Sequence, residues 1–106
     1  MVSPFDEEMA IFSVSQVASM LGVQAAFVRR LDTEQVITPT RSDGGHRRYS
    51  HAEVQQVQRV AELAGEGLSL AGVRRVLELE AEVAELRRQV AALQSGQRQR
   101  QSTSEA

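Results

Sequence analysis

The 106-residue sequence contains no cysteine. Disulfide bonds, thiolate metal ligands and thiol redox chemistry are therefore excluded. No apolar run approaches the length of a membrane span and the first residues do not resemble a signal peptide, so we expect a cytoplasmic protein without membrane contact. The two histidines, His46 and His51, have no carboxylate cluster at ligand spacing. We therefore expect no metal site and no cofactor.

Lysine is also absent, because all twelve basic residues are arginine. The net charge of -2 conceals an uneven distribution of these charges. Residues 13–50 contain five arginines and three carboxylates, whereas both flanking segments are acidic overall. A local basic excess of this size is weak support for a nucleic-acid partner.

Residues 35–49, QVITPTRSDGGHRRY, show the least helical periodicity in the chain. Residues 36–38 are of strand type, and Asp43-Gly44 favours a tight turn in which both central residues have positive φ. We therefore expect a small β-hairpin between two pairs of helices. Its arms carry three arginines and a tyrosine: Arg41, Arg47, Arg48 and Tyr49.

Two short helices are expected before this hairpin. Ser13 and Gln16 have the spacing of a capping box, and apolar residues then recur every three or four positions until Gly22. The pattern resumes from about Gln24 to Glu34. Two helices joined by a glycine turn are typical of a helix-turn-helix.

Two further helices are expected after the hairpin. Ser50 and Glu53 have the spacing of a second capping box, and the glycines at 65 and 67 end the helix that it begins. Ser69 can cap the fourth helix. Residues 95–106, rich in Gln, Ser and Arg, lack apolar periodicity and are expected to be disordered.

A stricter apolar repeat begins within the fourth helix. Valine occupies each a position and leucine each d position of a heptad, which predicts a coiled-coil seam between two copies of the chain. The seam consists of Val76, Leu79, Val83, Leu86, Val90 and Leu93. Valine at a, leucine at d and a pair between Glu82 and Arg87 favour parallel helices, but an antiparallel pair stays open. The helix either runs straight into the seam or bends near Leu79.

Taken in this order, the elements resemble the DNA-binding region of MerR-type transcription regulators over residues 11–93. The matching segments are FSVSQVASMLGV at 12–23, Val28-Arg29 and Asp32, ITPTR at 37–41 and GGHRRYS at 44–50. GGHRRYS with GLSLAGVRRVLELE at 67–80 is most similar to the heat-shock repressor branch, HspR. Where the family usually has a Gly-Leu pair, this chain has Gln35 and Val36.

The expected fold is mostly α: a winged helix-turn-helix with a small β-hairpin wing and a C-terminal coiled-coil dimerisation helix. We expect a flexible acidic N-terminus at residues 1–10 and the DNA-binding domain at 11–75. The dimerisation helix then occupies 76–94, and the disordered polar tail 95–106.

The candidates for DNA contact form two groups. Glutamine can pair with adenine, arginine with guanine, and an apolar side chain can meet a thymine methyl group. The base-contact candidates are Gln24, Ala25, Phe27 and Arg30. The other candidates, chiefly for phosphates, are Ser15, Arg29, Arg41, His46, Arg47, Arg48 and Tyr49.

Several of these residues have a purely structural alternative. Phe27 could be a core residue that packs on Leu31, and Arg29 could pair with Asp32 one turn later. Tyr49 could be buried against the helices, or it could combine both roles with its ring inward and its hydroxyl outward. The hairpin arginines could simply be solvated.

The resemblance implies a sequence-specific, nucleoid-associated transcriptional repressor that binds double-stranded DNA as a homodimer on an inverted repeat, with room for a protein co-regulator. We expect no catalysis, because no GK[ST] follows the glycines at 44 and 45 and Ser50 acts as a cap. No small-molecule effector is evident, since a polar tail follows the seam. The alternative is an adaptor that binds a partner protein through the seam helix and has only incidental affinity for DNA.

Overall fold

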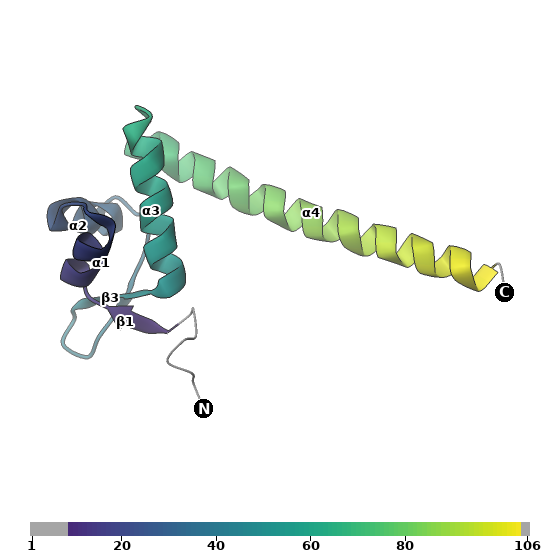
Figure 1. Ribbon diagram of the computed structural model, residues 1–106, viewed down its shortest axis with the longest axis horizontal. Helices are drawn as coiled ribbons and strands as arrows, with labels where there is room; N and C mark the ends of the chain where they lie inside the picture. Colours follow the sequence, from purple (N-terminus) through teal and green to yellow (C-terminus); the bar gives the residue numbers. More distant parts are fainter. Residues whose placement is uncertain (1–8, 105–106) are drawn as a thin grey trace. The chain divides into compact units, whose positions relative to one another are not determined.

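The structure is a computed structural model that describes residues 9–104. Its elements are β1 (Ala10–Phe12), α1 (Val14–Leu21), α2 (Ala25–Thr33), β2 (Thr40–Arg41), β3 (Arg47–Ser50), α3 (His51–Gly65) and α4 (Leu70–Ser104), and all of them except β2 are labelled in Figure 1. The chain divides into two compact units, one ending at Arg74 and the other beginning at Arg75. The predicted flexible N-terminus covers residues 1–10, and residues 1–8 lie outside the described part of the chain. The prediction is wrong at Ala10, which belongs to β1.

The helix-turn-helix forms as the local sequence predicts. The Ser13 amide donates to the Gln16 side-chain oxygen at 2.8 Å, and the Gln16 amide donates to the Ser13 hydroxyl at 3.2 Å. This capping box satisfies two amides at the start of α1. At the other end, Gly22 takes a left-handed conformation with φ 68°, which stops α1 and turns the chain towards α2.

A second left-handed residue ends α2, and it is not a glycine. Gln35 has φ 58° and is the only non-glycine residue with positive φ in the described chain. The Val36 amide donates to the Leu31 carbonyl at 2.8 Å, and the Gln35 amide donates to the Asp32 carbonyl at 3.0 Å, which is a Schellman motif. Because Val36 and Ile37 are tied back to α2, the strand expected at 36–38 does not form. Ile37 instead packs in the core at 4% exposure.

Replacing Gln35 with glycine should stabilise the protein. A left-handed conformation strains a residue that carries a Cβ, and glycine removes that strain at a smaller entropic cost. We expect Gln35→Gly to raise the free energy of unfolding by about 0.5 to 1 kcal/mol in urea denaturation. Gly22→Ala, the reverse change at φ 68°, should lower it by about 1 kcal/mol. Equal stability of all three proteins would contradict the assigned strain.

The sheet has three antiparallel strands in the order β1-β3-β2. Its β1 strand was not predicted, because three residues are too few for an alternating pattern and β1 depends on pairing with β3. We call residues 40–50, which contain β2, β3 and their connecting loop, the wing. Within it, Thr40 faces Arg48 and Arg41 faces Arg47.

The turn of the wing differs from the predicted two-residue type. The Ser42 amide donates to the His46 carbonyl, and the Gly45 amide donates to the Ser42 carbonyl, both at 2.8 Å. Gly45 has φ 80°, whereas Gly44 does not have a positive φ. The result is a three-residue loop that closes with a left-handed glycine. Asp43-Gly44-Gly45 contains two glycines, and the second takes the left-handed position.

The core of the first unit joins all its helices to the wing. A second capping box starts α3: the Ser50 amide donates to the Glu53 carboxylate at 2.8 Å, and the Glu53 amide donates to the Ser50 hydroxyl at 3.1 Å. The buried apolar residues are Val17, Ala18, Val28, Leu31, Ile37, Tyr49, Val54, Val57, Val60, Leu63 and Val73. The structure therefore confirms a mostly helical fold with a small sheet.

The long helix α4 spans 35 residues without interruption. The fourth helix is thus continuous with the seam. It also continues through Ser95 to Ser104, so the expected disorder of these residues is wrong. Gln, Arg and Ser have acceptable helix propensities, and within 95–104 only Gly96 opposes a helix. Among the described residues, no helix combines the length and apolar character that crossing a membrane requires.

Candidate nucleic-acid interface

A cleft of about 250 Å³ lies where the start of α1, the middle of α2 and the wing come together. Its lining residues are Ser13, Val14, Ser15, Arg29, Arg41, Gly45, His46, Arg47 and Arg48. We call it the basic cleft, because four arginines and a histidine line it and none of the nine lining residues is a carboxylate. Such a lining suits an anion, and guanidinium groups can hold a phosphate with two hydrogen bonds each.

The first turn of α1 adds backbone polarity to the basic cleft. Val14 and Ser15 are its first two residues, and amides at this position lack intrahelical acceptors. The positive end of the helix dipole therefore faces the cleft together with the exposed Ser15 hydroxyl. The structure thus places Ser15 beside the arginines predicted for phosphate contact.

Two arginines of the cleft have no carboxylate partner within residues 9–104. Arg29 is exposed on α2 and forms no ion pair there, so the alternative in which it pairs with Asp32 is wrong. Arg48 is half-buried, and its Nη1 donates only to the Arg47 carbonyl, at 3.1 Å. Both guanidinium groups retain donors for an external anion.

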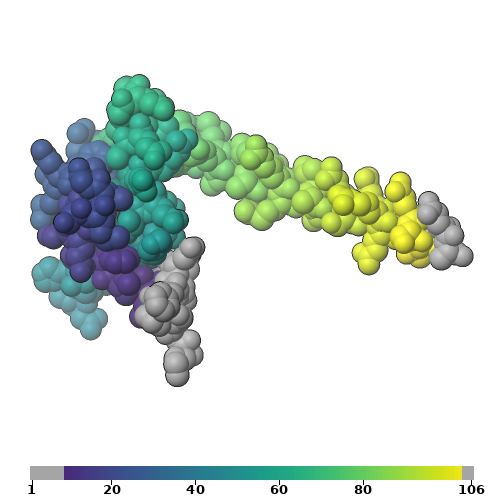
Figure 2. Space-filling view, in the orientation of Figure 1, coloured from purple at the N-terminus to yellow at the C-terminus, as the bar shows by residue number. Residues whose placement is uncertain are grey.

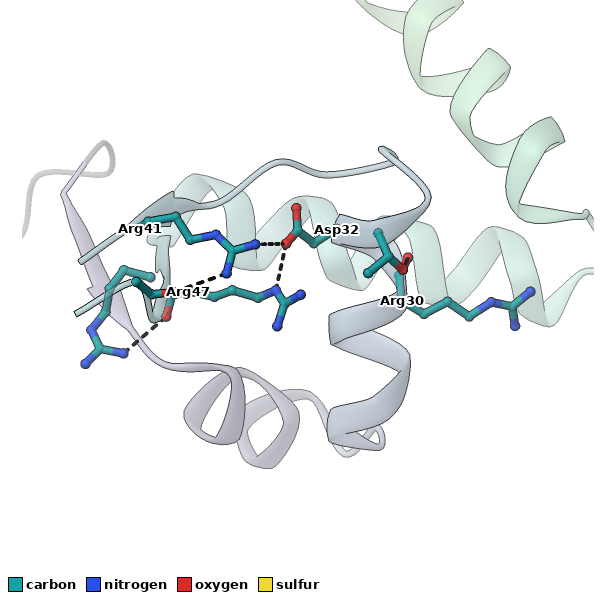
Figure 3. A network of polar contacts seen from close by, with 7 residues as sticks. Arg30, Asp32, Arg41 and Arg47 are labelled. Atoms are coloured by element: carbon teal, nitrogen blue, oxygen red, sulfur yellow. Dashed lines mark hydrogen bonds and ion pairs between the residues drawn. The ribbon is translucent and has the colours of Figure 1, made fainter. Parts of the chain in front are cut away.

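The other two arginines share one carboxylate. Arg41 Nη2 lies 2.8 Å from Asp32 Oδ2, and Arg47 Nε lies 2.7 Å from the same oxygen (Figure 3). The Asp32 side chain is 13% exposed, against 51% for Arg41 and 19% for Arg47. Their positive charge is therefore partly neutralised from within the protein. Arg41 and Arg47 line the cleft but contribute less free charge than Arg29 and Arg48.

The base-contact candidates lie outside the basic cleft. Gln24 is exposed at the N-cap of α2, whereas Ala25 and Phe27 are half-buried. Arg30 pairs with Glu34 at 2.6 Å, and the two side chains are 63% and 43% exposed. An ion pair this exposed contributes little to stability, so Arg30 can exchange Glu34 for another partner. Phe27 is half-buried, so its exposure does not distinguish a core residue from a base contact.

Tyr49 contradicts the sequence-based expectation of DNA contact. Its side chain is fully buried, and its hydroxyl is enclosed without a hydrogen-bond partner among residues 9–104. Burial raises the pKa of the hydroxyl above its ordinary value. The ring fills the core between the sheet and the helices, and this packing removes the hydroxyl from the surface. Tyr49 is therefore a structural residue.

Removing the Tyr49 hydroxyl should stabilise the fold. A buried hydroxyl without a partner has lost its hydration, and its deletion should gain about 1 kcal/mol. We expect Tyr49→Phe to have a higher free energy of unfolding and unchanged affinity for duplex DNA, as measured by fluorescence anisotropy. Tyr49→Ala should instead lose about 3 to 5 kcal/mol. If a folded Tyr49→Phe variant bound DNA more weakly, the result would contradict this structural role and support the predicted contact between Tyr49 and phosphate.

Sequence reasoning missed Asp32 as the acid between two wing arginines, and it missed Ser13, Val14 and Gly45 as cleft residues. A signal for Asp32 was available. In an antiparallel hairpin centred near Gly44, Arg41 and Arg47 face each other. Two like charges at facing positions destabilise a strand pair, so a nearby carboxylate is expected to offset them.

The predicted seam residues lie along one long helix. Five are exposed, from 42% for Leu79 and Val83 to 67% for Leu93, and Val76 is half-buried. Figure 2 shows the side chains of α4 in green to yellow, and every residue from Glu78 to Ser95 is exposed. A row of exposed valine and leucine is uncommon on a monomer and is typical of a binding surface.

Comparison with known proteins identifies relatives by sequence. Residues 12–80 match the model of the MerR HTH family regulatory protein. The putative heat shock protein HspR of Streptomyces coelicolor is 34% identical over 88 residues, which are 82% of this chain and 58% of that protein. The HTH-type transcriptional regulator GlnR of Bacillus anthracis is 27% identical over 67 residues, 63% of this chain and 52% of GlnR. The chain thus spans little more than half the length of these relatives.

Solved structures share the fold. A MerR family transcriptional regulator from Bacillus cereus aligns with a TM-score of 0.58 at 21% identity, over 83% of this chain and 70% of that one. HiNmlR, a MerR family regulator lacking the sensor domain and bound to promoter DNA, aligns with a TM-score of 0.59 at 20% identity, over 74% and 77%. The family match extends from the first strand across both capped helices and the wing into α4. This chain belongs to the MerR family of helix-turn-helix regulatory proteins.

Proposed function

We propose that this protein is a sequence-specific transcriptional regulator that binds double-stranded DNA as a homodimer on an inverted repeat. The observation that carries the proposal is the basic cleft, which gathers four arginines and the start of α1 without a carboxylate in its lining. Phosphates are the anions that a duplex presents in a regular row. The described residues contain no group of three or more potential metal ligands, and the proposal includes no cofactor or catalysis.

In this proposal α2 enters the major groove and the wing lies alongside. Gln24 at the N-cap of α2 and Arg30 within α2 are exposed, and their side chains can read adenine and guanine. Arg29 and Arg48 hold phosphates and fix the position of α2 without reading sequence. The structure of HiNmlR on promoter DNA supports this use of the shared fold.

The dependence of DNA binding on salt tests the proposal. Each neutralised phosphate contributes a slope of about -0.9 in a plot of log affinity against log salt. We expect a slope steeper than about -3 for binding to duplex DNA. A flat response would favour the alternative, an adaptor whose exposed seam binds a partner protein.

The homodimer is supported by the exposure of the seam. Leu79, Val83, Leu86, Val90 and Leu93 lie on one stripe of α4, and a second copy offers an identical stripe. We assign residues 11–75 to DNA binding and residues 76–94 to dimerisation. Pairing two DNA-binding units gives the two-fold symmetry that an inverted repeat requires.

The charges of α4 favour antiparallel pairing. Residues 75–86 contain four glutamates and one arginine, whereas residues 87–104 contain four arginines and no carboxylate. Antiparallel helices place these unlike halves opposite each other, and parallel helices place like charges together. We therefore infer an antiparallel dimer, in place of the parallel arrangement that the valine and leucine positions favour.

One antiparallel register satisfies the whole seam. When Val83 faces the partner's Leu86, Val76 faces the partner's Leu93 and Leu79 faces the partner's Val90. Each valine at an a position then meets a leucine at a d position. In the same register, Glu80 approaches the partner's Arg87, so an attractive pair borders the centre of the seam.

Disulfide formation can test this register, because the natural chain has no cysteine. Val76→Cys and Leu93→Cys should not cross-link when each variant is oxidised alone, but they should cross-link when they are mixed. This follows because a disulfide requires Cα atoms within about 7 Å. Linked dimers of Val76→Cys alone would instead establish parallel pairing.

We propose that the protein represses transcription and that it acts in the cytoplasm, at the nucleoid. This proposal rests on the resemblance to heat-shock repressors and on the similarity to HspR, and a protein co-regulator is compatible with it. Sequencing the DNA fragments that the protein retains in cells, with transcript levels in a deletion strain, tests it. Increased transcription from the bound promoters after deletion is the expected result, and reduced transcription would indicate an activator.

A further inference from the structure

We propose that Asp32 is a positioning residue that fixes the wing relative to α2, so that phosphate contacts by the wing occur in register with base reading by α2. The inference rests on the proposed DNA-binding function and goes beyond it, by assigning a role in specificity to a residue that itself touches no DNA.

One oxygen atom makes the connection. Asp32 Oδ2 accepts a hydrogen bond from Arg41 Nη2 at 2.8 Å and another from Arg47 Nε at 2.7 Å (Figure 3). The two donors lie 9 and 15 residues away in sequence, one on each strand of the wing. A single side chain of α2 thus holds both arms of the hairpin. At 13% exposure it is shielded from most of the solvent that would weaken these contacts.

The register of the wing makes this carboxylate necessary. Arg41 and Arg47 are direct cross-strand partners, and like charges that face each other destabilise a pair of strands. The negative charge of Asp32 between them offsets the repulsion. Arg41 Nη1 also donates to the Gly45 carbonyl at 3.2 Å, so the same guanidinium group connects Asp32 to the loop. The position of the loop is therefore coupled to α2 through Arg41.

The arrangement divides the four arginines of the basic cleft by role. Arg41 and Arg47 are committed to Asp32, whereas Arg29 and Arg48 have no carboxylate partner in the described part of the chain. Loss of the Asp32 charge should free the guanidinium groups of Arg41 and Arg47 and, at the same time, make the position of the wing relative to α2 less defined. Affinity for any duplex should then persist or increase, while discrimination between sequences should fall. A residue needed only for folding would lower both.

The test combines a readout without DNA and a readout with DNA. Asp32→Asn removes the charge with little change in shape, and Asp32→Glu restores it. Asp43→Asn is the matched control, since Asp43 is exposed in the wing loop and its loss changes the net charge equally. Nitroxide labels on cysteines introduced at Ala26 and Ser42 report the distance between α2 and the wing. Because the natural chain has no cysteine, no other position is labelled.

We expect Asp32→Asn to broaden the distribution of label distances, and Asp32→Glu and Asp43→Asn to retain a narrow one. With a duplex selected by the natural protein from a random pool and a scrambled duplex, Asp32→Asn should reduce the ratio of the two affinities about tenfold. Its salt slope on the scrambled duplex should become steeper by about one.

Each failure has a distinct meaning. An unchanged distance distribution in Asp32→Asn would overturn the positioning role, whatever the protein does with DNA. A broadened distribution with an unchanged affinity ratio would overturn the link to specificity. If the natural protein binds neither duplex while Asp32→Asn broadens the distribution, the proposed function fails and the structural connection stands. An equal fall in the ratio for Asp43→Asn would assign the effect to net charge and overturn the proposal.

Discussion

Replacing Leu86 with lysine should convert the protein to a monomer and reduce its affinity for an inverted repeat at least about 100-fold. Leu86 is 56% exposed on α4, and its side chain would be buried against the partner's Val83 in the antiparallel register. An ammonium group at this position loses hydration without gaining a partner, and a dimer contains two of them. Each half-site would then bind independently, which removes the gain from joining two DNA-binding units.

Sedimentation equilibrium and fluorescence anisotropy on the same samples measure both effects. Ala84→Lys is the matched control. Ala84 is also an exposed residue of α4, but it lies away from the a and d positions that form the seam. The variant adds the same charge and should remain dimeric. A dimeric Leu86→Lys protein, or a monomer that still binds both half-sites tightly, would remove the seam from the proposed mechanism.

The second large effect is expected when Arg29 and Arg48 are both replaced with alanine. These are the two cleft arginines without a carboxylate partner among the described residues, so both retain donors for phosphates. A charged hydrogen bond of this kind contributes about 1.5 to 3 kcal/mol, and the pair should lower affinity about 100-fold or more. The loss should be the same on every duplex, because phosphates carry no sequence information.

The salt slope identifies the cause of that loss. Removing two phosphate contacts from each protomer, four in the dimer, should make it shallower by about 3 to 4. Arg75→Ala is a suitable control, since Arg75 is exposed, pairs with Glu78 at 3.1 Å and is absent from the cleft. By contrast, Gln24→Ala should change the preferred sequence and leave the slope unchanged. An unchanged slope in the double variant would show that these arginines do not face phosphates.

The features that the sequence predicted correctly depend on neighbouring residues. The capping boxes at Ser13 and Ser50 and the stop at Gly22 involve residues within four positions of each other, so local spacing decides them. The row of valine and leucine along α4 is likewise a property of one helix, and its role in dimerisation stays a prediction. These patterns were sufficient for the fold class and for the position of the wing.

The errors arose where distant residues compete for the same group. Ile37 looks like a strand residue, but its amide is bonded to the Leu31 carbonyl of the preceding helix. Tyr49 lies among predicted phosphate contacts, yet the core requires its ring. Asp32 looked like a helical neighbour of Arg29, but its position in the fold directs it to the wing. In each case tertiary packing overrides a pattern that is locally reasonable.

The uncovered apolar stripe of α4 also has a consequence for regulation. In the proposed homodimer a second copy covers this stripe, so the paired fraction depends on how much protein the cell contains. While most molecules are single, the number of pairs grows as the square of their concentration. Occupancy of a promoter would then respond steeply to abundance, and a moderate change in synthesis or proteolysis could switch transcription without any bound effector.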